Sequence, residues 1–469
     1  MNRLDQVLER VAKKITPSKS EQNRLFSLIS KVEKIADNII KPFGFEKTIS
    51  GSTIRDTWLS DKKEFDLFIL FPESCSRRVL EQKGLELGKK IMKRLGGSYE
   101  IAYAEHPYIR GKFGEFSIDI VPCYRVKSAS CIKSAVDRTP FHNEYIKNNL
   151  KPAMSTDVRL LKQFCKSLDI YGSDLRTRGF SGYLCELLII YYGSFKNLVR
   201  RASKWKPVVF IDIERHCTVR DPQVYFKDQP LVVIDPTDPK RNVAASLSPD
   251  NFVKFVKACE LFVKNPDESF FEKREQPIKL SELEGHLKEH GTNLILIKFH
   301  RPKGIVDDIL WPQMRKTARR IKKLLESHEF EVLDSYVWAD EKFGYIIVEM
   351  KKWELPEKRR LVGPPIGSDT HVREFLKRWR DSKTYVENGR WVAEVERRYR
   401  NAESLLDEFF KKTEKELIGE GVRSHIAKGV SKGFKILDIK GVEKLIKTNR
   451  GFSIFIRKCL KRDIIQNNS

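Results

Sequence analysis

The spacing of hydrophobic residues changes along the chain, and these changes predict where helices and strands lie. Hydrophobic residues recur every three or four positions over residues 25–39 and again over 79–95, which is the period of an amphipathic helix. Residues 67–71 are instead hydrophobic at every position, and residues 118–121 form a similar run interrupted by one acid. Each run stops at a proline, as central strands buried on both faces do. Together these segments indicate an α/β domain over residues 1–146.

The next part of the chain follows the helical period almost throughout. Helices are predicted from Thr156 onward, over residues 181–195 and over residues 251–263, with one short strand at residues 231–234. The segment 181–195 is hydrophobic nearly all round, so we expect it to be buried. Residues 147–265 are therefore predicted to form a mainly helical domain.

Strand patterns return in the third part of the chain. The predicted strands are residues 293–299, 329–338 and 343–351, and a basic helix at residues 311–328 lies between the first two. This order predicts a small α/β domain made of residues 266–361 and 415–469.

A Gly-Pro-Pro break at residues 363–365 marks a further segment, residues 362–414. Two arginine-rich helices are predicted there, over residues 372–380 and 391–410. The fold class predicted for the whole chain is α/β plus α, divided among several domains.

The charge balance favours a polyanionic partner. Of 469 residues, 89 are Lys or Arg and 64 are Asp or Glu, a net charge of +25. Such an excess favours nucleic acid first and an acidic membrane second, and the alternative is a solvated basic surface without a partner.

Neither a membrane span nor a disulfide framework is predicted. The most hydrophobic helix candidate, residues 183–195, is too short to cross a bilayer and carries Glu186. The eight cysteines are scattered and form no CxxC pair, which is typical of buried thiols in a reducing compartment. We therefore expect a cytoplasmic protein without a membrane partner.

Three acids in strand-like segments are the strongest chemical signal. Glu64 and Asp66 are two residues apart, so in a strand their carboxylates share one face while Phe65 and Leu67 face the core. Asp119 stands alone in the other run. Acids this close repel one another unless a divalent cation compensates, and about three carboxylates can hold two Mg²⁺ ions for phosphoryl transfer. The alternative is that they are ordinary acids at a solvent-facing edge.

A Gly-Ser turn precedes the paired acids. Gly51 allows a close backbone approach, and Ser52 offers a hydroxyl and an N–H group at the predicted start of a helix. Arg55, about one turn later, could reach the same phosphate oxygens. By themselves these residues could equally be an ordinary helix cap.

The Gly-Ser turn followed by an acid-x-acid strand resembles the nucleotidyltransferase superfamily of DNA polymerase β. More specifically, the chain resembles class I (archaeal-type) CCA-adding enzymes. The segments that carry this resemblance span most of the chain in family order: residues 51–72, 104–108, 118–124, 133–142, 178–186, 235–236, 240–245, 305–308 and 387–391.

The resemblance implies a head, neck, body and tail, with catalysis between head and neck. It implies Glu64, Asp66 and Asp119 as the metal ligands and catalytic acids. The residues that would bind the nucleotide are Ser52, Arg55, Lys162 and Tyr171 at the triphosphate and His142 and Arg241 near the base. The implied substrates are CTP, ATP and the acceptor stem and T arm of tRNA. A homodimer is also implied.

Without the resemblance, several of these residues have plainer interpretations. Lys162 would lie on a solvated helix face, His142 would be a cap or surface histidine, and Arg241 would be a solvated loop residue. Glu186 is different, because an acid in a buried helix needs a partner, and we expect a salt bridge with an arginine.

The basic C-terminal half predicts RNA binding through phosphates and 2′-hydroxyls. Its cations recur along the predicted helices, with Trp379, Trp391 and Tyr399 interleaved: Arg315, Lys316, Arg319, Arg320, Lys322, Lys323, Lys377, Arg378, Arg380, Arg390, Arg397, Arg398 and Arg400. Two other functions fit the same pattern. One is a poly(A)-type or other RNA terminal nucleotidyltransferase, and the other is a catalytically silent tRNA-binding protein.

Overall fold

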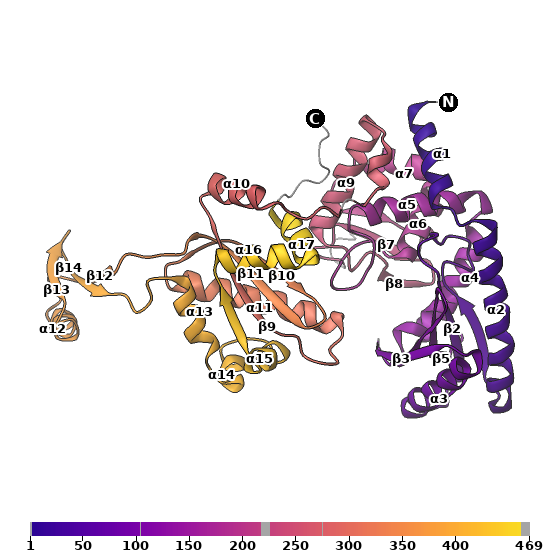
Figure 1. The fold of residues 1–469 in the computed structure, drawn as a ribbon, viewed down its shortest axis with the longest axis horizontal. Helices are drawn as coiled ribbons and strands as arrows, with labels where there is room; N and C mark the ends of the chain where they lie inside the picture. Colours follow the sequence, from indigo (N-terminus) through magenta and orange to yellow (C-terminus); the bar gives the residue numbers. More distant parts are fainter. Residues whose placement is uncertain (1, 104, 217–225, 274, 461–469) are drawn as a thin grey trace. The chain divides into compact units, whose positions relative to one another are not determined.

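The computed structural model describes residues 2–103, 105–216, 226–273 and 275–460 (Figure 1). The described residues form two compact units, residues 2–273 and residues 275–460. The predicted head and neck both lie in the first unit, and the predicted body and tail both lie in the second. Within the described residues, no helix is both long enough and apolar enough to span a bilayer.

The first unit contains a five-stranded mixed sheet. Its strand order is β1 (Glu46–Ser50), β2 (Glu64–Pro72), β5 (Phe116–Arg125), β4 (Pro107–Phe113) and β3 (Ser98–Tyr103). Only β2 and β5 are parallel to each other. Phe65 and Leu67 are fully buried in one core with the helices α2 (Lys19–Ile40) and α3 (Arg77–Leu95). Both strands that were predicted to be central are confirmed, as is the inward direction of Phe65 and Leu67.

A second core of the same unit is mainly helical. Its helices are α1 (Arg3–Ile15), α4 (Thr139–Asn149), α5 (Ser155–Ser167), α6 (Gly182–Tyr192), α7 (Phe195–Ala202) and α9 (Pro249–Lys264), and its small sheet consists of β6 (Val209–Ile211), β7 (Leu231–Asp235) and β8 (Asp238–Asn242). Short 3₁₀ helices lie at Lys41–Phe43, Ala129–Cys131, Ala135–Arg138, Pro152–Met154 and Glu268–Phe271. Helix α6 is buried from Leu184 to Ile189, as predicted, but Tyr191 near its end is exposed.

Helix α1 belongs to this second core, although it precedes the sheet in the chain. Leu4, Val7 and Val11 are buried among the neck residues. The helical period marks the apolar face of α1 but does not indicate which core that face joins, so the sequence grouped residues 1–15 with the head.

The second unit contains a four-stranded antiparallel sheet in the order β10 (Glu331–Ala339), β11 (Phe343–Lys352), β9 (Asn293–His300) and β15 (Phe434–Leu437). Its helices are α10 (Leu280–His290), α11 (Asp307–Ser327), α13 (Ala402–Phe410), α14 (Glu414–Gly419), α15 (Ser424–Ser431), α16 (Ile439–Thr448) and α17 (Arg450–Leu460). Strand β15 pairs with β9, so residues beyond 415 contribute a strand to the predicted body.

A separate three-stranded sheet lies between β11 and α13 in the chain. It consists of β12 (Lys358–Pro365), β14 (Arg390–Glu396) and β13 (Lys383–Glu387), with helix α12 (Asp369–Arg378) between β12 and β13 (Figure 1). The predicted helix over residues 372–380 is confirmed by α12. The predicted helix over residues 391–410 is wrong in its first part, because residues 390–396 form β14. Asn388 and Gly389 have φ of 47° and 72°, the conformation of a tight hairpin turn, and this turn pairs Glu387 with Arg390.

Candidate functional site

The three predicted acids share one face of the first sheet. Asp66 on β2 and Asp119 on β5 are direct partners in the parallel register, and Glu64 lies two residues before Asp66. Lys62 Nζ lies 2.5 Å from Glu64 Oε1, and Arg110 Nε lies 3.2 Å from Asp119 Oδ1. Among the described residues, the Asp66 carboxylate has no hydrogen-bond or ion-pair partner, and no group of three or more His, Cys, Asp or Glu side chains is gathered closely enough to hold a metal ion.

The surroundings of Asp66 disfavour its ionised form. Burial and the neighbouring charges of Asp119 and Glu64 raise its pKa to about 7. Protonation or a cation would relieve this electrostatic penalty. The available ligands are all carboxylate oxygens, the type that Mg²⁺ prefers, so the chemistry of these residues fits magnesium, although among the described residues the three side chains are not gathered closely enough to ligate one ion together.

Residues 51–56 form a turn between β1 and β2, and the helix predicted there is absent. Gly51 has a φ of 111° and Asp56 a φ of 53°, so left-handed backbone at both ends prevents helical propagation. A Cβ on Gly51 would lie 3.5 Å from Asp66 Oδ2, an ordinary contact distance, so the turn lies beside the acid and glycine is favoured here by its φ of 111°. Ser52 therefore lies directly beside the acidic face.

Arg55 and Lys162 converge on Glu186, which is fully buried on α6. Arg55 Nε donates to Glu186 Oε1 at 3.2 Å, and Lys162 Nζ lies 3.3 Å from the same oxygen. Burial alone would raise the pKa of Glu186, but Lys162 and Arg55 outweigh it and the net shift is downward. The predicted salt bridge of Glu186 with an arginine is confirmed.

Lys162 is buried, so its interpretation as a solvated residue is wrong. Besides Glu186, its Nζ donates to the carbonyl oxygen of Thr57 at 3.1 Å and to Thr57 Oγ1 at 3.0 Å. These contacts equal the three donors of an ammonium group. Burial lowers the pKa of Lys162, and the charge of Glu186 opposes that shift. The periodicity of α5 gave no sign of this, because the partners of Lys162 come from other elements.

Tyr171 lies close to Lys162. A Cβ on Gly182 would lie 3.2 Å from Tyr171 Oη and 3.7 Å from Lys162 Cε, which places both side chains beside the start of α6. Burial raises the pKa of Tyr171. The structure thus brings Arg55, Lys162 and Tyr171 together, and Ser52 begins the turn that carries Arg55.

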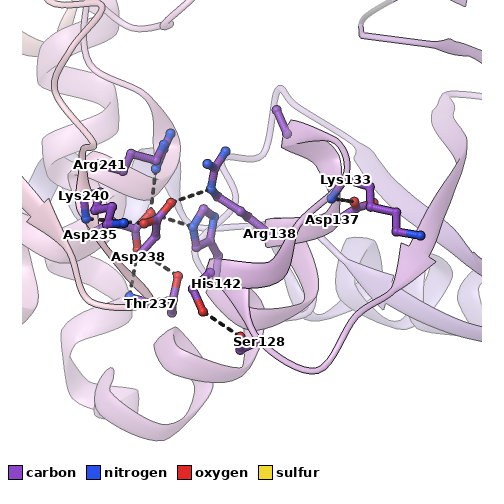
Figure 2. A network of polar contacts seen from close by, with 12 residues as sticks. Ser128, Lys133, Asp137, Arg138, His142, Asp235, Thr237, Asp238, Lys240 and Arg241 are labelled. Atoms are coloured by element: carbon purple, nitrogen blue, oxygen red, sulfur yellow. Dashed lines mark hydrogen bonds and ion pairs between the residues drawn. The ribbon is translucent and has the colours of Figure 1, made fainter. Parts of the chain in front are cut away.

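His142 and Arg241 line a cavity of about 990 Å³. His142 is on α4, and Arg241 is on strand β8, not in a loop as predicted. Both side chains contact Asp235 (Figure 2): His142 Nε2 lies 2.8 Å from Asp235 Oδ2, and Arg241 Nη1 donates to the same oxygen at 2.7 Å. Arg138, which also lines the cavity, donates from Nε to Asp238 Oδ2 at 3.0 Å.

Asp235 is the residue that sequence reasoning missed at this site. It is fully buried at the end of β7, where burial would raise its pKa, but hydrogen bonds from His142, Thr237 and Arg241 hold the pKa well below its usual value. The available signal was an acid directly after the hydrophobic run 231–234, at the point where a strand ends.

The second unit presents exposed cations, as predicted. Lys316, Arg319 and Lys323 are exposed on α11 at helical spacing, so they share one face. On α12, Arg378 lies over the ring of Trp379, with Cζ 5.4 Å from the ring centre.

Comparison with known proteins gives three family matches: "Nucleotidyltransferase domain" at residues 29–142, "tRNA nucleotidyltransferase, second domain" at residues 156–272 and "CCA-adding enzyme, C-terminal domain" at residues 290–438. The chain is 38% identical over 457 residues to the CCA-adding enzyme of Methanosarcina mazei, with 96% of each chain covered. It is 40% identical over 404 residues to that of Methanocaldococcus jannaschii, with 84% of this chain and 88% of the relative covered. Among solved structures, the Cid1 poly(U) polymerase with Mg 3′-dATP bound has a TM-score of 0.45 and 14% identity, over 57% of this chain and 98% of that one.

Proposed function

The chain belongs to the family of CCA-adding enzymes, and on this basis we propose which of its residues carry out the reaction. The activity is the template-independent addition of CCA to the 3′ end of tRNA by nucleotidyl transfer. CTP and ATP supply the nucleotides, and pyrophosphate is released. The main observation behind the proposed site is that Asp66 pairs with Asp119 in the parallel register. The turn beside Asp66 carries Arg55, which shares the Glu186 carboxylate with Lys162.

Glu64, Asp66 and Asp119 would hold two Mg²⁺ ions. When bound, the ions would lower the pKa of the attacking 3′-hydroxyl and stabilise the charge of the leaving pyrophosphate. Lys62 and Arg110 would have to release Glu64 and Asp119. Both cations are about half exposed, and ion pairs of this kind contribute roughly 0–1 kcal/mol to stability. Giving up these two pairs for a metal ion therefore costs little free energy.

Ser52, Arg55, Lys162 and Tyr171 would bind the triphosphate. Arg55 has five N–H donors, so it can contact Glu186 and a phosphate together. Lys162 would exchange one of its present contacts for a phosphate oxygen. Glu186 would keep both cations at the same place before the nucleotide arrives.

His142 and Arg241 would contact the base in the cavity that they line, and Arg241 would also contact RNA phosphates. The exposed cations of α11 and α12 would bind the acceptor stem and T arm of tRNA. We also propose that the protein acts in the cytoplasm and forms a homodimer. Light scattering of the purified protein would test the homodimer.

The decisive experiment incubates the protein with tRNA that lacks its 3′ CCA, together with labelled CTP and ATP. Addition of C, C and A followed by a stop supports the proposal. Long A tails would instead identify a poly(A)-type enzyme, and no incorporation would identify a silent tRNA-binding protein. Asp66→Ala and Asp119→Ala should each lower incorporation at least ~10³-fold, because the metal site supplies several kcal/mol. Both variants should retain tRNA binding, and Glu46→Ala, at the far end of β1, should change neither property.

A further inference from the structure

Asp235 binds two of the side chains that line the cavity, His142 and Arg241. Its Oδ2 contacts His142 Nε2 at 2.8 Å and Arg241 Nη1 at 2.7 Å (Figure 2). Its Oδ1 accepts from Tyr183 Oη at 3.2 Å. Thr237 adds two further donors to Oδ1, its N–H at 3.0 Å and its hydroxyl at 2.9 Å. A fully buried carboxylate with five donors has one fixed position.

The ring of His142 is fixed from a second side. It stacks on the Tyr183 ring with a centroid distance of 4.0 Å and an interplanar angle of 17°. Because the Tyr183 hydroxyl donates to Asp235, the carboxylate, the phenol ring and the imidazole ring form one rigid group. His142 can neither rotate nor translate without breaking a contact to Asp235 or Tyr183.

The carboxylate also determines which ring nitrogen of His142 carries the proton. An ionised carboxylate only accepts hydrogen bonds, so His142 Nε2 must present an N–H group to Asp235. In the neutral ring, Nδ1 is then the hydrogen-bond acceptor. Among the described residues, Nδ1 has no hydrogen-bond partner. Arg241, which donates to the same Asp235 oxygen and lines the same cavity, has four further N–H groups that can donate to a base.

An acceptor next to a donor distinguishes bases by class. Cytosine and adenine both present an exocyclic amino group, which donates, beside a ring nitrogen that accepts. Uracil and guanine present the opposite order, a carbonyl oxygen that accepts beside a ring N–H that donates. A site with one fixed acceptor and one fixed donor therefore matches C and A and mismatches U and G.

We propose that Asp235 is a positioning residue for nucleotide specificity: by accepting from His142 Nε2 and Arg241, it fixes an acceptor and a donor that admit cytosine and adenine and reject uracil and guanine. This inference rests on the proposed addition of C and A. It assigns the choice of base class to a buried side chain that holds two of the residues lining the cavity.

The test compares Asp235→Asn with the unchanged protein. An asparagine can donate to His142 Nε2, which allows the other tautomer and turns Nδ1 into a donor. The measured quantity is kcat/KM for the first insertion onto tRNA lacking CCA, with CTP and with UTP. We expect the preference for CTP over UTP to fall about tenfold to hundredfold, the range for one matched polar contact.

A control separates specificity from stability. Asp157 is another carboxylate of the same core, and it accepts from the backbone N–H of Phe195 at 2.8 Å. Asp157→Asn should leave the CTP preference unchanged. If Asp235→Asn does not fold, Tyr183→Phe serves as the second variant. It keeps the ring stack but removes one donor to Asp235, and it should lower the preference severalfold in the same direction.

The outcomes separate the two hypotheses. If the unchanged protein adds neither C nor A, the proposed function fails. If it adds both selectively, and folded Asp235→Asn or folded Tyr183→Phe keeps the full preference for CTP, the role of Asp235 is refuted while the proposed function stands.

Discussion

Lys162 on α5 and Glu186 on α6 form an ion pair in which neither side chain is accessible to solvent: Nζ lies 3.3 Å from Oε1, and the exposed fractions are 2% and 0%. An isolated buried charge is costly, so each of these groups depends on the other. Arg55 shares the same carboxylate. The proposed triphosphate site and the stability of the unit are therefore linked through Glu186.

Glu186→Gln should destabilise the first unit strongly. The substitution keeps the shape but leaves Lys162 and Arg55 without their anion, and breaking a buried pair costs about 3–5 kcal/mol. Urea denaturation at pH 7 measures the free energy of unfolding. Glu260→Gln, which removes the exposed pair with Lys257, is the matched control and should cost less than ~1 kcal/mol. Equal effects of the two variants would show that the buried pair has no special role.

The pKa of Asp66 predicts how stability and magnesium binding depend on pH. In the folded protein this pKa is about 7, above the ordinary value of 3.8, so the folded state binds more protons between these values. The stability that Asp66 contributes is therefore present below pH 3.8 and is lost as pH rises through 7. Magnesium binds the ionised form, so the increase in melting temperature caused by MgCl₂ should grow from pH 6 to pH 8. Asp66→Asn should abolish that growth, and an unchanged pH dependence in this variant would contradict the prediction.

Gly84→Ala should destabilise the sheet that carries the acids. Gly84 lies on α3 where the helix packs on β5, and an added Cβ would lie 2.5 Å from Pro122 Cβ. The steric cost, about 1–3 kcal/mol, exceeds the helical preference of alanine over glycine, about 1 kcal/mol. Gly285 on α10 is the matched control, since nothing lies within 4 Å of its added Cβ, and Gly285→Ala should stabilise the protein. Thermal denaturation measures the melting temperature of each variant. A higher melting temperature for both variants would refute the close packing of α3 on β5.

Neutralising one face of α11 should weaken tRNA binding and reduce its dependence on salt. The triple replacement of Lys316, Arg319 and Lys323 by glutamine should lower affinity, and the slope of log affinity against log salt should fall by up to about 3. Fluorescence anisotropy with labelled tRNA at several salt concentrations measures both quantities. The same replacement of Lys90, Lys93 and Arg94 on α3 removes equal charge from the first unit. An equal loss in that control would mean that net charge alone governs binding.

The sequence predicted features that depend on local patterns. The strands carrying Asp66 and Asp119 follow from their hydrophobic runs, and the shared face of Glu64 and Asp66 follows from the two-residue period of a strand. The family resemblance supplied His142 and Arg241, which individually had plainer interpretations. Predicting these features requires only the neighbouring residues in the sequence or a known family pattern.

Features that depend on long-range contacts were not predictable in this way. The anchoring role of Asp235 depends on side chains from α4, α6 and β8 that converge only in the fold. Strand β14 lies where the arginine-rich sequence predicts a helix, because the Asn388-Gly389 turn lets residues 390–396 pair with β12 and β13. No periodicity could show that Lys162 is buried, since a lysine on a helix normally faces solvent.

The sheet formed by β12, β13 and β14 leaves and rejoins the body at one place. The N–H of Leu355 donates to the carbonyl of Arg400 at 2.8 Å, and the N–H of Ala402 donates to that of Trp353 at 2.9 Å. These two hydrogen bonds hold the ends of residues 356–399 together, as the ends of a hairpin are held. Insertions or deletions within this segment therefore need not move the point where the chain re-enters the body. A change in the length of this segment would then leave the pairing of the body sheet intact.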